Sequence, residues 1–205
     1  MRSLLLVVYL LIPKRPVDSG CPDQCSCNEW NVVTCISTNG MPYPIPNDTK
    51  ALHISNSDID YISKSSFRGL AKLQRLNMDN ASIRMIEFGS FDVLRETLVS
   101  LSLRYNYIVT VGKGGIQNLN FLRKLDLSFN RIRSIRADDF DCLQNLKMLH
   151  LNDNEIGYFD RDTFVFPTSL NFLNLSENKI RSIYPRTFYH LPKLTELDIS
   201  GNLLV

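Results

Sequence analysis

The sequence lacks a strong excess of charge of either sign, has few histidines, and has no long apolar segment after its first residues. Lys and Arg number 23 against 21 Asp and Glu, a balance that does not favour nucleic acid or an acidic membrane surface as a partner. The histidines, His53, His150 and His190, are scattered and belong to no recognisable Ser-His-Asp or metal-binding pattern. We therefore expect a protein that is not an enzyme, binds no cofactor or metal, and does not span a membrane.

The N-terminus has the layout of a secretory signal peptide. A basic start precedes the apolar run Leu4–Ile12, which is too short to cross a bilayer about 30 Å thick as a helix. Small residues near Ser19 favour cleavage there, so we assign residues 1–19 to the signal peptide; an uncleaved anchor is the alternative. Loss of these residues would bring the formal charge from +2 to near zero.

Four of the five cysteines lie close together near the start of the mature chain. Cys21, Cys25, Cys27 and Cys35 favour a disulfide staple, because secretion places them in an oxidising compartment; a zinc site is the alternative. Their spacing alone does not decide the pairing. We expect Cys142 to be a half-buried, inert thiol, with pairing to another chain or segment as the second interpretation.

Three sequons, at Asn47, Asn80 and Asn174, follow the N-x-Ser/Thr rule for glycosylation. Secretion would permit modification, and exposure decides each case. Short motifs of this kind also arise by chance.

The most informative pattern is the phrase LxxLxLxxN, which recurs in a frame of 24 residues. Its last position, here called the ladder position, defines seven units, with one step of 25 residues in the second unit. We divide the mature chain into a cysteine-rich cap, 20–48, and seven repeats, 49–205, the last incomplete and uncapped. The ladder positions are Ser57, Ala81, Asn106, Asn130, Asn154, Asn178 and Asn202.

Each unit predicts one short strand with one buried face, because apolar and polar residues alternate in phrases such as Leu125-Asp-Leu127. Strands one period apart must stack in parallel. One large apolar residue ten positions after each ladder position predicts a core spine; most are phenylalanines, from Phe67 to Phe188. An Asn amide both donates and accepts hydrogen bonds, so we expect Ala81 to mark a weak or hydrated point of the ladder.

The chain resembles the extracellular leucine-rich repeat proteins of animals, which include Toll-type receptors, axon-guidance proteins and matrix proteoglycans. The resemblance rests on the cysteine cap and the phased repeats. It implies an α/β leucine-rich repeat solenoid, or horseshoe, with parallel strands on the concave face and irregular or short helical turns on the convex face. It also implies the pairs Cys21–Cys27 and Cys25–Cys35. The departures are Ser57, Ala81, the longer second unit and the lack of a C-terminal cysteine cap. We interpret the chain as truncated before such a cap, with the uncapped end available for association.

In such a solenoid the exposed strand residues form a wall that is the usual binding face. Apolar residues on this wall, interspersed with basic ones, have the composition of a protein-binding patch; tolerated apolar exposure is the alternative. A glycan on Asn174 would mask part of the wall. The candidate partner-binding residues are Arg104, Tyr105, Lys124, Phe129, Met148, His150 and Phe172.

The sequence thus predicts an extracellular recognition module of receptor, adhesion or guidance type that holds a protein or glycan ligand on its concave face. A structural matrix protein without a signalling role is the alternative. We expect the protein to be secreted, or to lie at the cell surface if the chain belongs to a longer membrane protein. The ligand and the subfamily stay open.

Overall fold

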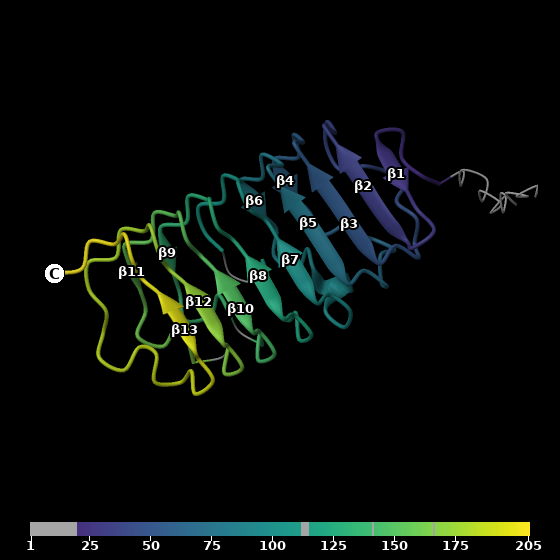
Figure 1. Cartoon of the computed structure of the whole chain (residues 1–205). Helices are drawn as coiled ribbons and strands as arrows, with labels where there is room; N and C mark the ends of the chain where they lie inside the picture. Colours follow the sequence, from purple (N-terminus) through teal and green to yellow (C-terminus); the bar gives the residue numbers. More distant parts are fainter. Residues whose placement is uncertain (1–19, 112–114, 141, 166) are drawn as a thin grey trace, which may run out of the picture.

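The computed structural model describes residues 20–111, 115–140, 142–165 and 167–205, so the predicted signal peptide, 1–19, lies outside the described residues. The chain winds into a stack of coils, with one strand of each coil on a common face (Figure 1). These strands form a nine-stranded sheet in which only the first pair is antiparallel. In spatial order they are β1 (Cys25–Cys27), β2 (Val32–Ile36), β3 (Ala51–Ser55), β5 (Arg75–Asp79), β7 (Ser100–Ser102), β8 (Lys124–Asp126), β10 (Met148–His150), β12 (Phe172–Asn174) and β13 (Glu196–Asp198).

The register of the sheet follows the sequence frame. Leu76 pairs with Leu101, Leu101 with Leu125, and Leu125 with Leu149, so equivalent positions of successive units lie side by side. These leucines point inward and are almost completely buried. The predicted leucine-rich repeat solenoid is therefore confirmed, and exposed strand residues of successive units lie side by side.

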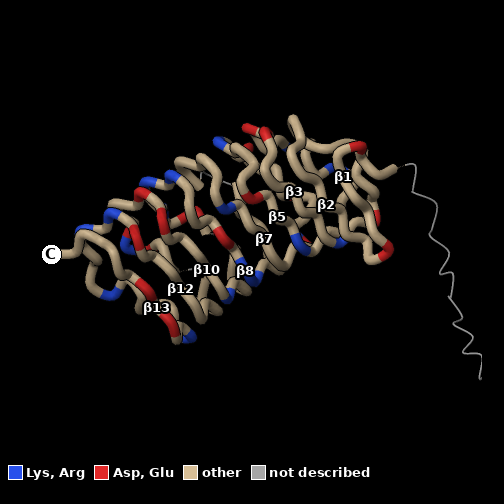
Figure 2. Tube along the Cα trace, turned by 45° about the horizontal axis from the view of Figure 1, so that its top comes forward, with Lys and Arg blue, Asp and Glu red and all other residues tan. Residues whose placement is uncertain are grey.

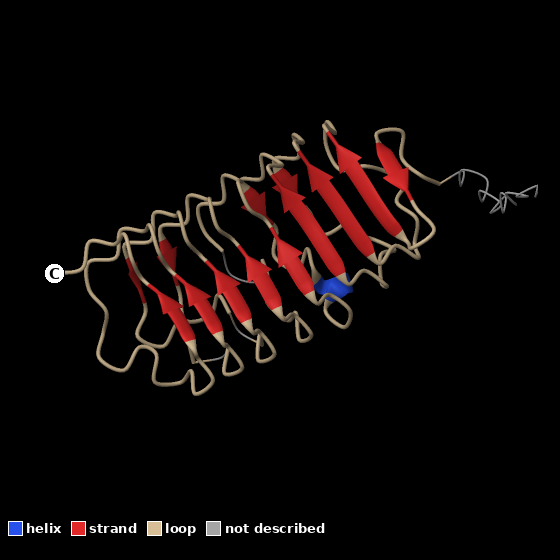
Figure 3. Ribbon diagram, viewed as in Figure 1, coloured by secondary structure: helices blue, strands red, loops and turns tan. Residues whose placement is uncertain are grey.

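The side opposite the sheet is mostly irregular, and the described residues contain almost no helix (Figure 3). Two short parallel pairs lie there, β4 (Tyr61–Ile62) with β6 (Met85–Ile86) and β9 (Ser134–Ile135) with β11 (Tyr158–Phe159). A 3-10 helix, η1 (Asp92–Leu94), falls in the longer second unit and buries Leu94. The extra residue is thus absorbed in the segment that leads into β7 and leaves the strand register intact. None of the described helices is long and apolar enough to cross a membrane.

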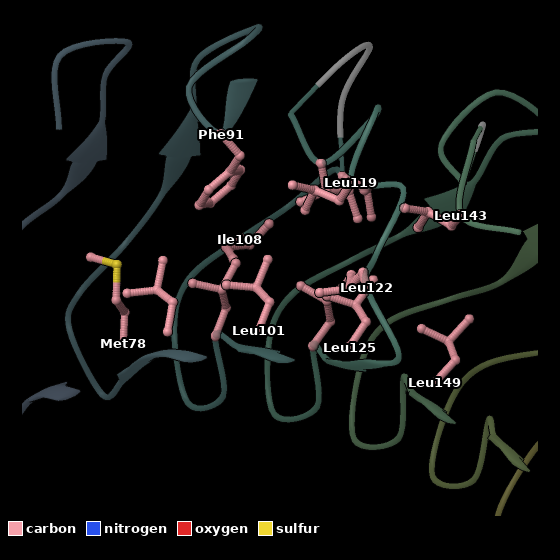
Figure 4. Packing of buried hydrophobic residues seen from close by; sticks show 14 of the residues in the cluster. Met78, Phe91, Leu101, Ile108, Leu119, Leu122, Leu125, Leu143 and Leu149 are labelled. Atoms are coloured by element: carbon pink, nitrogen blue, oxygen red, sulfur yellow. The ribbon is translucent and has the colours of Figure 1, made fainter. Parts of the chain in front are cut away.

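Two layers of side chains fill the core. Figure 4 shows one row from the strands, with Leu101 and Leu125, and a second row behind it that includes Phe91 and Leu119. The predicted aromatic spine runs through the rear layer, where Phe67 and Phe91 stack with ring centroids 5.2 Å apart. Further along, the ring of Phe164 lies 6.5 Å from Phe140 and 5.6 Å from Phe188.

The asparagine ladder satisfies backbone groups in two successive coils. The Asn130 Nδ2 donates to the carbonyls of Leu103, Leu127 and Ser128 at 2.9–3.2 Å, and its Oδ1 accepts the Ile108 N–H at 3.1 Å. Equivalent bonds recur at Asn154, Asn178 and Asn202. Since an unpaired buried backbone group costs about 1–3 kcal/mol, each rung contributes substantially to stability.

Ala81 is not a hydrated point of the ladder, one of the two states that the sequence led us to expect. It is fully buried, and its own carbonyl accepts the Ile59 N–H at 3.0 Å, the kind of backbone donor that a ladder amide accepts in later units. The Ala81 N–H in turn donates to Asn106 Oδ1 at 3.0 Å. The Ala81 carbonyl thus takes the acceptor role of the missing amide, and the Met78 carbonyl accepts from Asn106 Nδ2 at 2.9 Å, in a part of the stack where the strands β2, β3 and β5 are also longer.

The N-terminal cap contains the disulfides Cys21–Cys27 and Cys25–Cys35, the crossed pairing that the resemblance implies. The second disulfide joins β1 to β2, and the first closes the chain back onto β1. Cys142 is a free thiol and is exposed, so the expectation of a half-buried thiol was wrong. Its left-handed backbone, with φ of 65°, explains the difference, because a tight turn holds the residue out of the core.

Candidate functional site on the strand face

The exposed side chains of the nine-stranded sheet, together with the turn residues that follow each strand, form a surface that we call the strand face. This is the face predicted to be concave. Acidic and basic residues are interspersed along the stack of coils, and neither sign dominates it (Figure 2). The chemistry of the face therefore depends on local groups of residues.

The residue immediately before each ladder position adopts a left-handed backbone from unit to unit. At most of these positions the chain has Asn, Asp, Glu or Gly, but Tyr105 and Phe129 occupy two of them, with φ of 55° and 56°. A left-handed conformation costs a residue with a Cβ roughly 1–2 kcal/mol, and only Gly, Asn and Asp adopt it routinely. Two bulky aromatic residues therefore stand where the backbone favours small polar ones.

The two aromatic rings stack on each other. Their centroids are 4.3 Å apart and their planes are inclined by 23°. The guanidinium of Arg104 lies 5.1 Å from the centroid of Tyr105 and 5.7 Å from that of Phe129. Tyr105 is 48% exposed and Phe129 is partly buried, so the pair presents an apolar surface with a cation beside it. We call these three residues the aromatic patch.

A polar network fixes Arg104 in place. Its Nε donates to Ser128 Oγ at 3.2 Å and lies 3.7 Å from Asp126 Oδ2. Asp126 is almost fully buried, and its Oδ1 accepts the N–H and the hydroxyl of Ser128 at 3.2 and 2.6 Å. The same Asp/Asn-x-Ser bonding pattern recurs at Asn174 with Ser176 and at Asp198 with Ser200. The cation is thus held with limited freedom beside the rings.

A second group of candidate residues lies on the strands themselves, with His150 at the carboxyl end of β10 and the other three at the first position of their strands. Lys124, Met148 and Phe172 occupy one register on the neighbouring strands β8, β10 and β12. Met148 is 38% exposed, whereas Phe172 is partly buried. The His150 ring lies beside Phe172, with a centroid distance of 4.8 Å.

Burial lowers the pKa of His150 below its ordinary value, and the charges of Lys124 and Arg104 act in the same direction. The carboxylate of Asp126 opposes them. The His150 Nε2 is buried and has no hydrogen-bond partner among the described residues. A neutral imidazole therefore suits this position better than a charged one.

The structure separates the seven predicted partner-binding residues into these two groups. Arg104, Tyr105 and Phe129 meet directly at the carboxyl ends of their strands. Lys124, Met148, His150 and Phe172 lie on the strands themselves. The sequence frame placed all of them on one face but did not reveal which of them touch.

Sequence reasoning missed Tyr107, which lies one residue past the ladder position Asn106. Its ring is 39% exposed and has the guanidinium of Arg131 at 4.6 Å and that of Arg84 at 5.4 Å. The available signal was an aromatic residue where neighbouring units carry Ser82 and Arg131. This position lies beyond the alternating apolar and polar residues of the strand, so the repeat pattern did not identify it as part of the wall.

The sequons differ in their surroundings. Asn47 and Asn80 are exposed, and the Asn80 Nδ2 donates to Asn56 Oδ1 at 2.7 Å. Asn174 is half-buried on β12, where its Oδ1 is bonded by Ser176. It lies on the strand face two residues from Phe172, so a glycan on Asn174 would cover this part of the face. Among the described residues, no group of three or more His, Cys, Asp or Glu is placed to hold a metal ion.

Comparison with known proteins gives a consistent result. The family model "Leucine rich repeat" matches residues 96–156 and 144–204. Leucine-rich repeat-containing protein 3 of Danio rerio is 34% identical over 124 residues, which cover 58% of this chain and 45% of that protein. A probable glycoprotein hormone G-protein coupled receptor of Anthopleura elegantissima is 31% identical over 130 residues, which cover 62% of this chain and 14% of that protein.

A crystal structure of a TLR13–ssRNA13 complex has a similar fold, with a TM-score of 0.71 and 32% sequence identity. The match covers 75% of this chain and 22% of the other. The chain thus spans less than half the length of each of these proteins.

Proposed function

Because the chain belongs to the leucine-rich repeat family, we propose that it is an extracellular protein-binding module whose aromatic patch forms the centre of the contact with a protein ligand. The ligand would lie across the strand face and cover the rings of Tyr105 and Phe129. The Arg104 guanidinium, held by Asp126 and Ser128, would supply a positioned donor beside them.

The observation that carries this proposal is the placement of two aromatic residues in left-handed turn positions. Stacking of an aromatic pair contributes about 0.5–1.5 kcal/mol, and a left-handed backbone opposes it with roughly 1–2 kcal/mol for each residue. The pair therefore adds little or nothing to folding. Exposed aromatic and Arg side chains that do not serve the fold are typical of the residues that dominate protein interfaces.

The relatives support the extracellular setting. One similar protein is named as a probable hormone receptor, and the two disulfides of the cap suit an oxidising compartment. We propose accordingly that the chain acts outside the cell, as a secreted protein or as part of a cell-surface receptor. A matrix protein that contributes only shape is the competing function, and it has no need of the aromatic patch.

A binding screen with matched variants tests the proposal. The protein is expressed in secreted form and assayed against an array of extracellular protein domains, next to the variant Tyr105→Asn/Phe129→Asn. Asn fits the left-handed turns, so the variant should stay folded. The control variant Tyr184→Asn/Tyr189→Asn removes two exposed tyrosines outside the strand face, one of which contacts Arg161.

We expect at least one ligand whose binding is weakened about a hundredfold or more by the patch substitutions and is unchanged in the control. A loss of that size is typical of an interface hot spot, about 2–4 kcal/mol. Ligands that bind both variants equally would indicate a different contact surface. A protein without ligands in such a screen would favour the matrix function.

A further inference from the structure

Three side-chain donors without partners line up across three neighbouring strands of the strand face. Arg75 of β5, Ser100 of β7 and Lys124 of β8 share one register. Within the described part of the chain, neither cation forms an ion pair, and the Ser100 hydroxyl has no hydrogen bond. β7 lies between β5 and β8, and neighbouring strands are about 4.8 Å apart. The two cationic side chains therefore start about 10 Å apart, with Ser100 between them.

The space between the two cations belongs to a hollow of about 220 Å³ on the strand face. Its central strand, β7, contributes only the small side chains Ser100 and Ser102, and longer residues of β5 and β8 rise on both sides. The hollow also includes Asp79 and Asp126, but each already has an oxygen engaged in hydrogen bonds. Asp79 Oδ1 accepts from Ser102 Oγ and the Arg104 N–H, and Asp126 Oδ1 accepts from Ser128.

We propose that this hollow binds the carboxylate of an acidic side chain, Asp or Glu, from a protein partner. Arg75 would pair with the carboxylate through its planar fork, Lys124 would approach from the other side, and the Ser100 hydroxyl would donate from below. This assignment rests on the proposed function and adds the chemistry of the partner to it. We call the trio Arg75, Ser100 and Lys124 the carboxylate notch.

The surroundings specify the partner further. Lys124 lies next to Met148, and Met148 lies next to Phe172, at the same register. A partner segment that places its acidic residue in the notch therefore brings a neighbouring residue over an apolar row. The favoured ligand is a peptide segment with one acidic residue followed or preceded at short range by an apolar one.

The local charge favours a single carboxylate over a nucleic-acid backbone. Three basic residues and two acidic ones line the hollow and leave one net positive charge. Further along the face the exposed residues include Glu177, Glu196 and Asp198, which would repel a chain of phosphates. Tight binding of a nucleic acid requires several phosphates to be neutralised along its length, and this face offers no such row of cations.

Panning of a displayed library of random twelve-residue peptides tests the notch without a known partner. Four proteins are compared after their folding is verified by thermal unfolding. They are the wild type, the notch variant Arg75→Glu/Lys124→Glu, the patch variant Tyr105→Asn/Phe129→Asn, and the control Arg68→Glu/Lys72→Glu, which makes the same charge change as the notch variant at exposed positions on another part of the coil.

We expect the wild type and the control to select peptides with an Asp or Glu close to an apolar residue, and the notch variant to select Lys or Arg instead. Replacement of the acidic residue of a selected peptide by Gln or Asn should weaken binding to the wild type by about tenfold, the effect of losing one charge-assisted hydrogen bond. The same replacement should leave binding to the notch variant unchanged or improve it.

The outcomes separate this inference from the proposed function. Peptides that require Tyr105 and Phe129 but show no acidic preference would overturn the notch and leave the proposed function intact. Acidic peptides that depend on the notch but not on the aromatic patch would overturn the proposed function and leave the notch intact. Selection of no peptide that depends on either group of residues would overturn both. Binding of a uridine oligonucleotide that is lost in the notch variant, without selection of acidic peptides, would overturn the carboxylate assignment in favour of phosphate.

Discussion

The protein has two sets of aromatic residues on opposite sides of its sheet, and they differ in burial and in backbone conformation. Behind the sheet, Phe67, Phe91, Phe140 and Phe164 are fully buried, one in each of their coils. On the strand face, Tyr105 and Phe129 are partly exposed and occupy left-handed turns. Both sets stack with neighbours at the period of the repeat, so stacking alone does not tell them apart.

The difference lies in what the backbone requires. Removing a rear ring would open a cavity between two coils, whereas removing a front ring would relieve an unfavourable backbone conformation. A repeat protein thus offers an internal reference, because equivalent positions of other units show what the fold needs. Asn80 and Asp153, which take the turns on either side of the aromatic pair, show that no aromatic residue is needed there.

The largest effect is expected behind the sheet. Phe140→Ala should lower the free energy of unfolding by about 3–5 kcal/mol, since it removes a fully buried ring and leaves a cavity. Phe129→Asn should change it by no more than about 1 kcal/mol, because lost stacking and relieved backbone strain nearly cancel. Urea unfolding of both variants measures the contrast. Equal losses would mean that the front ring also belongs to the core.

Loss of a ladder asparagine, which lies between the two sets of aromatic residues, should lower the free energy of unfolding by a smaller amount. Asn130→Ala leaves the Ile108 N–H without its acceptor and removes one of the two amide donors from the carbonyls of Leu103 and Leu127, so we expect a loss of about 1–3 kcal/mol, the cost of one unpaired buried group. Asn152→Ala is the matched control, because its amide bonds only the nearby Asp153 side chain. It should cost less than about 0.5 kcal/mol, as most surface substitutions do. Similar losses for both would show that the ladder is hydrated.

His150 should make the strand face sensitive to pH near neutrality. Burial, together with the charges of Lys124 and Arg104, lowers the pKa of His150, and Asp126 opposes the shift. Since the unfolded chain then binds the proton more readily, stability should be complete above the ordinary pKa of 6.5 and fall as the pH decreases through it.

His150→Gln should show a weaker fall in stability over that range, measured as melting temperature from pH 7.5 to pH 5. His190→Gln serves as the control for a histidine of the back turns. An identical pH profile for His150→Gln and wild type would show that His150 does not contribute to the pH dependence.

Much of this architecture could be predicted from the sequence, because a fixed period determines which residues face the core. The period placed Leu125 and Phe140 inside and Tyr105 and Phe129 outside, and the structure agrees. The period could not show that the Ala81 carbonyl replaces a ladder amide. That substitution depends on backbone geometry, which the side-chain pattern does not encode.

The candidate site was predicted less completely, for a related reason. The position of a residue in the repeat predicts the face on which it lies. Its contacts with residues of neighbouring units depend in addition on side-chain rotamers and on the conformation of the turns. The network from Asp126 through Ser128 to Arg104 therefore emerged only from the structure. Arg75 was not among the predicted partner-binding residues. A single exposed Arg in one strand does not indicate a binding site, and its neighbours Ser100 and Lys124 were identified only in the structure.

A small expected change in stability tests the central claim, that the aromatic patch serves binding and not folding. Its direct test is the free energy of unfolding of Tyr105→Asn/Phe129→Asn, measured by urea denaturation against the wild type. We predict a value within about 1 kcal/mol of the wild type or above it, because two left-handed turns are relieved while one stacked pair is lost. A loss of about 3 kcal/mol or more would contradict this account and assign the aromatic patch to the fold.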